Sequence, residues 1–409
     1  GKLEVGTLVI DLGEDQQSAA LSAEQGGTVA HGPAVLRVAD RSISVRRWGL
    51  APADQILLGS WFGMASPQAC LTKLDLSGNV LTVESAQVFA KHIKSSQLRE
   101  IVLGHDVPFA VHDTERKVLL TSQERDSTPK VFVSTRNIKG QTSSGSELLS
   151  AADAVVLAPI IETLPAIEVV SLRGNLDITG GTGPPQARQY GQEMAGWNAL
   201  CESWTDPAVL PNLKKLDLSR CGLNNFALEK LAPVLRRTGA VAQLEELALS
   251  DNDALTGKEL RTSALGSVPI ENLSRDLVED LWIRGGNIMG WKTMLNALTF
   301  SHLRGLHVDN CRLGDDAFYI LAHTMKNMTE LRELSIWRNR LSLKSAEYMG
   351  EALRHYSKVN ARVKLQRLIF GSDPKRRPVR SGDTTESGLQ TYAYSTRELD
   401  FSPPTPDNG

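Results

Sequence analysis

The chain has 409 residues, of which 41% are hydrophobic and 22% are charged, and its mean hydropathy is −0.20. These values are typical of a soluble globular protein, and the net charge of −2 argues against a basic surface for nucleic acid or anionic lipid. No apolar run approaches the ~20 residues that a membrane-spanning helix needs. We therefore expect neither a nucleic-acid partner nor a membrane span.

The four cysteines have no paired spacing; they are Cys70, Cys201, Cys221 and Cys311. This arrangement favours free thiols in a reducing compartment over a disulfide framework. We therefore expect an intracellular protein located in the cytoplasm, with an organelle as the alternative. The chain begins at Gly1 instead of methionine, which indicates a fragment or a processed form.

The N-terminal part, residues 1–50, contains two segments of strand character, Gly6–Leu12 and Val35–Val45, separated by a stretch rich in Gly, Ser, Ala and Gln. We interpret it as an N-terminal cap or as degenerate repeats, because the end of a repeat array must cover its open core. A helix is predicted over Ala51–Met64. The residues assigned to its apolar face are Ala53, Ile56, Leu57 and Trp61.

An aliphatic pattern recurs along residues 51–373 and is clearest in two consecutive copies that begin at Leu303 and Leu331, 28 residues apart. The copies share offsets 0, 3, 5, 8 and 10, filled by Leu303, Leu306, Val308, Cys311, Leu313 and by Leu331, Leu334, Ile336, Asn339, Leu341. Other copies begin at Leu71, Leu98, Ile167, Leu213, Leu244, Val278 and Leu365. The spacing L-x-x-L-x-L-x-x-N/C-x-L predicts a short strand followed by a helix in each copy.

Two insertions interrupt this array, at about residues 104–146 and 176–210. The first contains the strand-like runs Lys117–Leu120 and Lys130–Val133, and either an inserted hairpin or an extended surface loop fits it. The second combines a Gly- and Pro-rich breaker cluster with a predicted helix over Tyr190–Trp204. Residues 374–409 are rich in Arg, Ser, Thr and Pro, which predicts a tail that is disordered or draped on the body.

The pattern over about Ala51–Asp373 resembles the ribonuclease-inhibitor-like class of leucine-rich repeats. The resemblance implies an α/β fold, namely a horseshoe-shaped leucine-rich repeat solenoid with a parallel concave sheet and outer helices. Most members of the class bind proteins. The resemblance therefore implies a non-enzymatic interaction module, scaffold or accessory subunit of a larger complex, which binds a protein through its concave face and inserted loops. Because the class includes activators of the small GTPase Ran, a GTPase-activating regulator is the alternative.

Side chains alternate along a strand, so the positions between the core leucines line the concave sheet. In the C-terminal half these positions gather seven residues, which we predict to form a partner-binding surface: Trp282, Arg284, His307, Asp309, Glu333, Trp337 and Arg338. Trp and Arg are strongly enriched in binding hot spots, and a solvated strand has no folding reason to display tryptophan. The alternative is that the insertions or the tail cover the tryptophans.

Signals for catalysis are weak throughout the sequence. The pairs His105–Asp106 and His112–Asp113 have metal-ligating chemistry, but Pro108 separates them and no third ligand has a diagnostic spacing. The glycines within Gly174–Gly183 lack the Lys-Ser/Thr of a phosphate-binding loop. No G-x-S-x-G, C-x-x-C, H-E-x-x-H or kinase signature occurs. We therefore expect no enzyme activity and no catalytic, cofactor or metal site.

Overall fold

The computed structural model describes residues 7–10, 34–37, 41–65, 71–104, 107–115, 118–119, 149–181, 190–236, 243–256, 259–260, 282–283, 287–299, 301–339, 341–359, 365–370 and 397–400. The chain divides into two compact units. Unit 1 comprises Gly1–Gly183, Arg188–Lys215 and Gly239–Val241. Unit 2 comprises Pro184–Ala187, Leu216–Thr238 and Ala242–Gly409.

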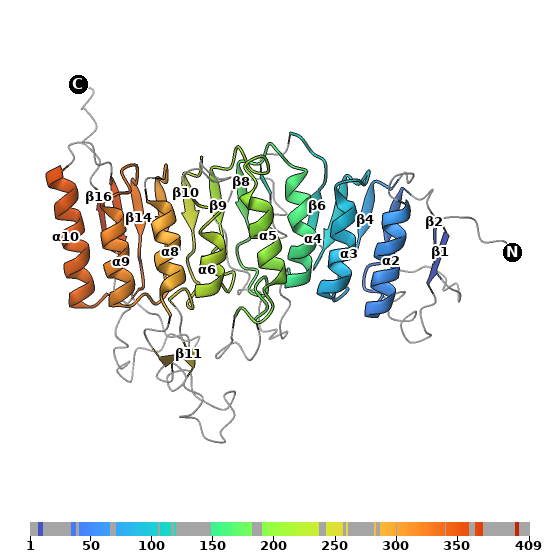
Figure 1. Cartoon of the computed structure of the whole chain (residues 1–409), viewed down its shortest axis with the longest axis horizontal. Helices are drawn as coiled ribbons and strands as arrows, with labels where there is room; N and C mark the ends of the chain where they lie inside the picture. The colour runs from blue at the N-terminus through green and yellow to red at the C-terminus, as the bar shows by residue number, and fades with distance from the viewer. Residues whose placement is uncertain are drawn as a thin grey trace, which may run out of the picture. The chain divides into compact units, whose positions relative to one another are not determined.

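Within each unit the leucines of the pattern lie between a layer of helices and a layer of short strands (Figure 1). In strand β13 (Gly305–His307), for example, Leu306 is fully buried while His307 faces outward, as strand alternation requires. The alternation of strands with helices confirms the expected α/β class.

In unit 1, strands β1 (Thr7–Ile10) and β2 (Ala34–Arg37) form an antiparallel pair. A second sheet has the order β3 (Ser42–Ser44), β4 (Lys73–Asp75), β5 (Glu100–Leu103) and β6 (Val107–Ala110). Its first three strands are parallel, and β6 closes the edge as an antiparallel hairpin with β5. Strand β7 (Val118–Leu119), from the predicted first insertion, pairs in parallel with β8 (Val169–Ser171).

The helices of unit 1 pack in chain order. They are α2 (Pro52–Ala65), α3 (Val83–Ile93), α4 (Ala151–Glu162) and α5 (Ala195–Thr205). Helices α3 and α4 begin with capping boxes, Thr82 with Ser85 and Ser150 with Asp153. The helix predicted over Tyr190–Trp204 is confirmed in part as α5, in which Trp197 and Trp204 are fully buried.

The predicted helix at Ala51–Met64 is confirmed as α2, but the face assigned to it is only partly right. Trp61 is buried as expected, whereas Ala53, Ile56 and Leu57 are exposed and Leu58 and Phe62 are buried in their place. The buried face also includes Gln55, whose side-chain amide donates to the carbonyls of Leu50 and Val80. A pattern of aliphatic residues alone does not place this polar residue in the core, because its burial depends on hydrogen bonds to other segments.

Unit 2 contains a sheet with the order β9 (Lys215–Asp217, which spans the boundary with unit 1), β10 (Glu246–Ala248), β13, β14 (Glu333–Ser335), β15 (Arg367–Phe370) and β16 (Arg397–Asp400). Strands β10, β13, β14 and β15 are parallel. The tail contributes β16, which pairs antiparallel with β15 and covers that edge of the sheet. Helices α6 (Asn225–Leu231), α8 (Met289–Leu298), α9 (Asp315–Met325) and α10 (Leu343–Val359) pack in chain order.

One predicted copy of the pattern is absent from the sheet. The segment beginning at Val278 was expected to supply a strand between the copies at Leu244 and Leu303, but β10 pairs directly with β13. Its described residues instead form β12 (Trp282–Ile283), which pairs antiparallel with β11 (Glu259–Leu260) in a separate two-stranded sheet. Two copies were predicted from Leu244 to Leu303, but α8 is the only described helix between β10 and β13. Strand β10 and helix α8 therefore form a single copy, with an insertion in the sequence between them.

A repeated turn follows the strand in six copies of the pattern. The residue at offset 7 has a positive φ in each copy where this position is described, namely Gly78 and Gly174 of unit 1 and Arg220, Asp251, Asn310 and Arg338 of unit 2. At the next position, the buried asparagines Asn79, Asn252 and Asn339 each donate to a carbonyl of their own turn and to one of the preceding copy; Asn339, for example, donates to Ile336 at 3.0 Å and to Val308 at 2.6 Å. The side-chain bonds of these asparagines tie consecutive turns together.

Candidate functional site

The outward-facing side chains of four parallel strands in unit 2 form a polar surface. Strands β10, β13, β14 and β15 place Glu246, Gly305, Glu333 and Arg367 in one register. The polar and aromatic side chains of this row and of the two rows that follow it, together with Arg338 in the turn after β14, are named the polar face. It consists of Glu246, Ser250, His307, Asp309, Glu333, Ser335, Trp337, Arg338 and Arg367. Five of the seven residues predicted from the sequence therefore lie on one surface.

The imidazole of His307 lies between two carboxylates from the neighbouring strands. Its Nε2 is 3.7 Å from Oε1 of Glu246, and its Nδ1 is 3.9 Å from Oε1 of Glu333. The absence of a side chain at Gly305 leaves room for this ring, because a β-carbon there would lie 3.3 Å from Nε2 of His307. Arg367 approaches the other oxygen of Glu333 at 3.5 Å. One imidazole thus lies between two carboxylates, and the guanidinium of Arg367 adds a positive charge beside the second carboxylate.

Asp309 connects the strand ends of three copies. Its Oδ1 accepts hydrogen bonds from Ser335 Oγ at 2.5 Å and from the backbone N–H of Trp337 at 2.7 Å. Ser250 Oγ donates to Oδ2 at 3.4 Å and accepts the backbone N–H of Asp309 at 3.1 Å. Burial raises the pKa of Asp309 above its ordinary value of 3.8, although the bonds from Ser335 and Trp337 and the nearby His307 act in the opposite direction. Through its hydrogen bond with the backbone N–H of Trp337, Asp309 fixes the position of the strand end that carries this side chain.

The substitution Asp309→Asn should favour folding more at pH 7 than at pH 4. Because burial raises the pKa of Asp309 in the folded chain, the stability that this carboxyl contributes is fully present below pH 3.8 and is lost as the pH rises through its folded-state pKa. Asparagine does not ionise. The free energy of unfolding of the wild type minus that of the variant, measured by urea denaturation, should therefore decrease from pH 4 to pH 7.

Asp309→Ala is the matched control for this pH experiment. It also removes the ionisable group, so it should show the same pH trend, but it leaves Ser335 and the Trp337 N–H without their acceptor. Its stability should be lower than that of Asp309→Asn by about 1–3 kcal/mol at every pH. A wild-type advantage that increases with pH would contradict the assignment.

Trp337 and Arg338 form the part of the polar face with the largest side chains. The guanidinium carbon of Arg338 lies 5.0 Å from the centroid of the Trp337 ring, a cation–π distance. Arg338 occupies the turn position of positive φ (59°), so its side chain leaves the sheet at the strand end. Both side chains are partly exposed. Trp and Arg are among the residue types most enriched at binding hot spots.

Two of the seven predicted site residues, Trp282 and Arg284, are not among the described residues of the polar face. The expectation that Trp282 lies in a strand of the parallel sheet was wrong, because it belongs to β12 in the separate antiparallel pair. A strand pattern does not specify its pairing partner, and this segment pairs with β11. Arg284 and the His105–Asp106 pair lie outside the described residues.

The other residues that the sequence marked as chemically reactive, His112 and the cysteines, have structural roles where the structure describes them. The backbone N–H of His112 donates to Thr163 Oγ1 at 3.0 Å, and its Nε2 lies 3.3 Å from the carbonyl oxygen of Ile93. Three cysteines, Cys201, Cys221 and Cys311, are buried free thiols. Within the described ranges, no three His, Cys, Asp or Glu side chains are grouped to hold a metal ion. No described helix combines the length and the apolar content needed to cross a membrane.

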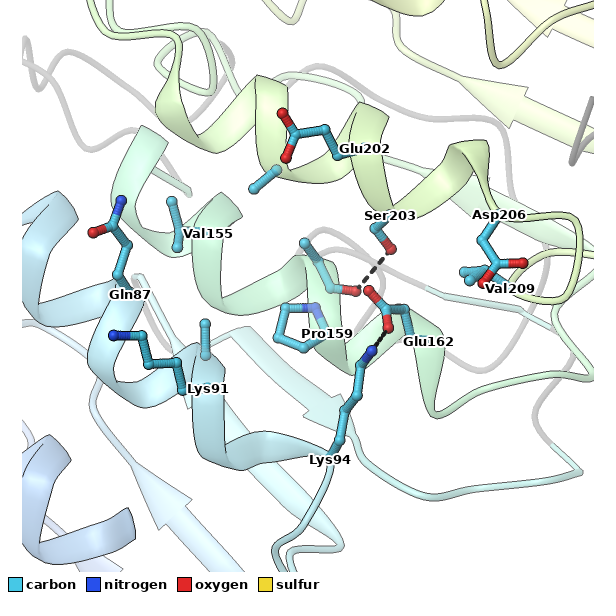
Figure 2. Close-up of a pocket in the computed structure, with 13 residues that line it drawn as sticks. Gln87, Lys91, Lys94, Val155, Pro159, Glu162, Glu202, Ser203, Asp206 and Val209 are labelled. Atoms are coloured by element: carbon cyan, nitrogen blue, oxygen red, sulfur yellow. Dashed lines mark hydrogen bonds and ion pairs between the residues drawn. The ribbon is translucent and has the colours of Figure 1, made fainter.

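A second surface feature is an open groove of about 670 Å³ along helices α3, α4 and α5 of unit 1 (Figure 2). The sequence analysis did not identify it, nor did it identify Glu246 and Arg367 of the polar face. Glu246 and Arg367 could have been found by aligning the copies at offset 2, where Glu246, Gly305, Glu333 and Arg367 stand in one column. The groove depends on how three helices pack, which no single segment indicates.

One comparison with known proteins supports the repeat assignment: the leucine-rich repeat family model matches residues 68–90 and 209–232. No curated protein matches the chain. Among solved structures, the leucine-rich repeat-containing protein LegL7 from Legionella pneumophila is 12% identical over 90% of both chains, with a TM-score of 0.32. The TLR13–ssRNA13 complex is 16% identical over 69% of this chain and 38% of that chain, with a TM-score of 0.23.

Proposed function

Because the chain is a leucine-rich repeat protein, a family whose domains generally mediate protein–protein interaction, we propose that it binds a protein partner through the polar face. The observation that carries the proposal is the pairing of Trp337 with Arg338 at the end of β14, beside His307 and the carboxylates of Glu246 and Glu333. A partly exposed indole offers much area at low entropic cost, and charged neighbours provide orientation.

The proposed role is that of a non-enzymatic scaffold or accessory subunit. Asp309, Ser250 and Ser335 are engaged with one another, which suits a preorganised docking surface. The proposed site of action is the cytoplasm. The buried free thiols of Cys201, Cys221 and Cys311 support this, because a reducing compartment keeps thiols unpaired.

Affinity capture followed by mass spectrometry tests the proposal. The wild-type chain should capture a partner that Trp337→Ala loses, with a dissociation constant raised at least ~30-fold, because truncating a hot-spot side chain costs about 2 kcal/mol or more. Glu246→Lys, which changes a partly exposed carboxylate, should weaken the same complex. Tyr319→Ala removes an aromatic ring that is 53% exposed on α9 and serves as the control with unchanged affinity.

The melting temperature of each variant separates binding from folding. A partner retained by both Trp337→Ala and Glu246→Lys at unchanged melting temperature would contradict docking at the polar face. The same purified chain should be added to GTP hydrolysis assays with a panel of small GTPases. Acceleration of hydrolysis would favour the GTPase-activating alternative over a scaffold.

A further inference from the structure

Helix α4 of unit 1 has the composition of a core helix although it lies in the outer layer. From Ala151 to Ile161 all its residues are buried, and its only charged residue in that span, Asp153, caps its N-terminus. An outer helix ordinarily has a polar stripe toward solvent. Its flanks are covered by α3 on one side and α5 on the other, and Gly196 lets α5 approach so closely that a β-carbon there would lie 2.1 Å from the Ala151 carbonyl oxygen.

The groove of Figure 2 runs above this recessed helix. Its floor is formed by Val155, Ala158 and Pro159 of α4, which have short, buried side chains, whereas the neighbouring helices contribute longer side chains such as those of Lys91 and Glu202. Pro159 has no N–H, so the carbonyl oxygen of Val155 lacks its usual donor four residues ahead. The carbonyl oxygen of Ala158 accepts a hydrogen bond from Ser203 Oγ at 3.3 Å. The floor is therefore apolar with one backbone acceptor.

The two walls of the groove carry opposite charge. Helix α3 contributes Lys91 and Lys94, and α5 and the turn after it contribute Glu202 and Asp206. Lys94 forms an ion pair with Glu162 at the end of α4. Lys91 and Glu202 are exposed and make no ion pair with another described residue. Across the groove, the α3 wall thus remains positive and the α5 wall negative.

We propose that this groove docks an amphipathic α-helix of a partner protein. The docked helix lays apolar side chains on Val155, Ala158 and Pro159 and directs acidic side chains toward Lys91 and basic side chains toward Glu202 and Asp206. A helix fits because it satisfies its own backbone hydrogen bonds, whereas the groove has no strand edge for an extended peptide. This surface lies in unit 1, so the proposal does not depend on the polar face of unit 2.

Designed peptides test the proposal directly. The probe is a fluorescent peptide of about 20 residues, long enough to be helical, with Leu and Ala on one face, Glu along one edge and Lys along the other. A second peptide exchanges the two charged edges, and a third has a central proline that prevents helix formation. Fluorescence anisotropy with the full chain should show binding of the first peptide at least ~10-fold tighter than of the other two.

Charge-reversal variants locate the binding site. The double variant Lys91→Glu/Glu202→Lys should invert the preference between the two charged helices, while Lys230→Glu on α6, an exposed lysine of unit 2, should leave it unchanged. Equal binding of all three peptides, no binding of any, or a preference unaffected by the double variant would overturn the proposal. Self-association of the chain that the double variant abolishes would overturn it too, because the groove would then be a contact between two copies.

Discussion

Gly290→Ala should lower the free energy of unfolding of unit 2 by about 2–4 kcal/mol, because overpacking and loss of a buried hydrogen bond add. Gly290 is the second residue of α8, and its N–H donates to Asn225 Oδ1 at 2.6 Å. A β-carbon at this position would lie 1.8 Å from the backbone carbonyl oxygen of Asn225. That oxygen belongs to the first turn of α6, so the clash is relieved only by moving one helix away from the other.

Gly350→Ala in α10 is the matched control, since no heavy atom lies within 4 Å of the β-carbon that it adds. This substitution should stabilise the helix by about 0.5–1 kcal/mol, because alanine has the higher helix propensity. Thermal unfolding followed by circular dichroism should therefore show opposite shifts for two identical chemical changes in two helices of one unit. If both variants moved the melting temperature in the same direction, the close approach of α6 and α8 would be disproved.

Asn339→Ala should cost about 3–5 kcal/mol, because it leaves several buried backbone groups without partners. The side chain is fully buried and donates to the carbonyls of Val308 and Ile336. Its Oδ1 accepts the N–H groups of Cys311 at 2.9 Å and Leu313 at 3.3 Å. One side chain therefore satisfies backbone groups of two consecutive turns, and unfolding in urea should show the loss.

Asn175→Ala provides the graded comparison in unit 1. Asn175 is equally buried and donates to the Leu172 carbonyl at 2.7 Å, but its Oδ1 accepts no hydrogen bond from any residue in the described part of the chain. With fewer bonds to lose, its replacement should cost only about 1–2 kcal/mol. Asn252→Ala, whose Oδ1 accepts two backbone N–H groups, should resemble Asn339→Ala. Equal losses for Asn175 and Asn339 would contradict this account of the turns.

Much of the polar face was predictable because the copies repeat. Once Leu306 and Leu334 are placed in the core, strand alternation places His307 and Ser335 outward, and adjacent parallel strands align them side by side. The same reasoning failed for Trp282, because local spacing does not reveal which strand a segment pairs with. It also could not show that Gly305 makes room for His307, or that Asp309 bonds to its neighbours, since these contacts join residues of different copies.

The sequence by itself determined the repeat class, the strand–turn–helix order of each copy and the buried leucines and asparagines, because these follow from spacings within a dozen residues. Only the tertiary structure showed which of the predicted copies supply a strand to the parallel sheet. It also showed that β16 covers one sheet edge, and that α4 forms the floor of a groove whose two walls carry opposite charge. The physical reason is that strand pairing and helix packing depend on interaction free energies between segments that are far apart in the sequence. A local pattern of side chains does not specify which segments will pack against it.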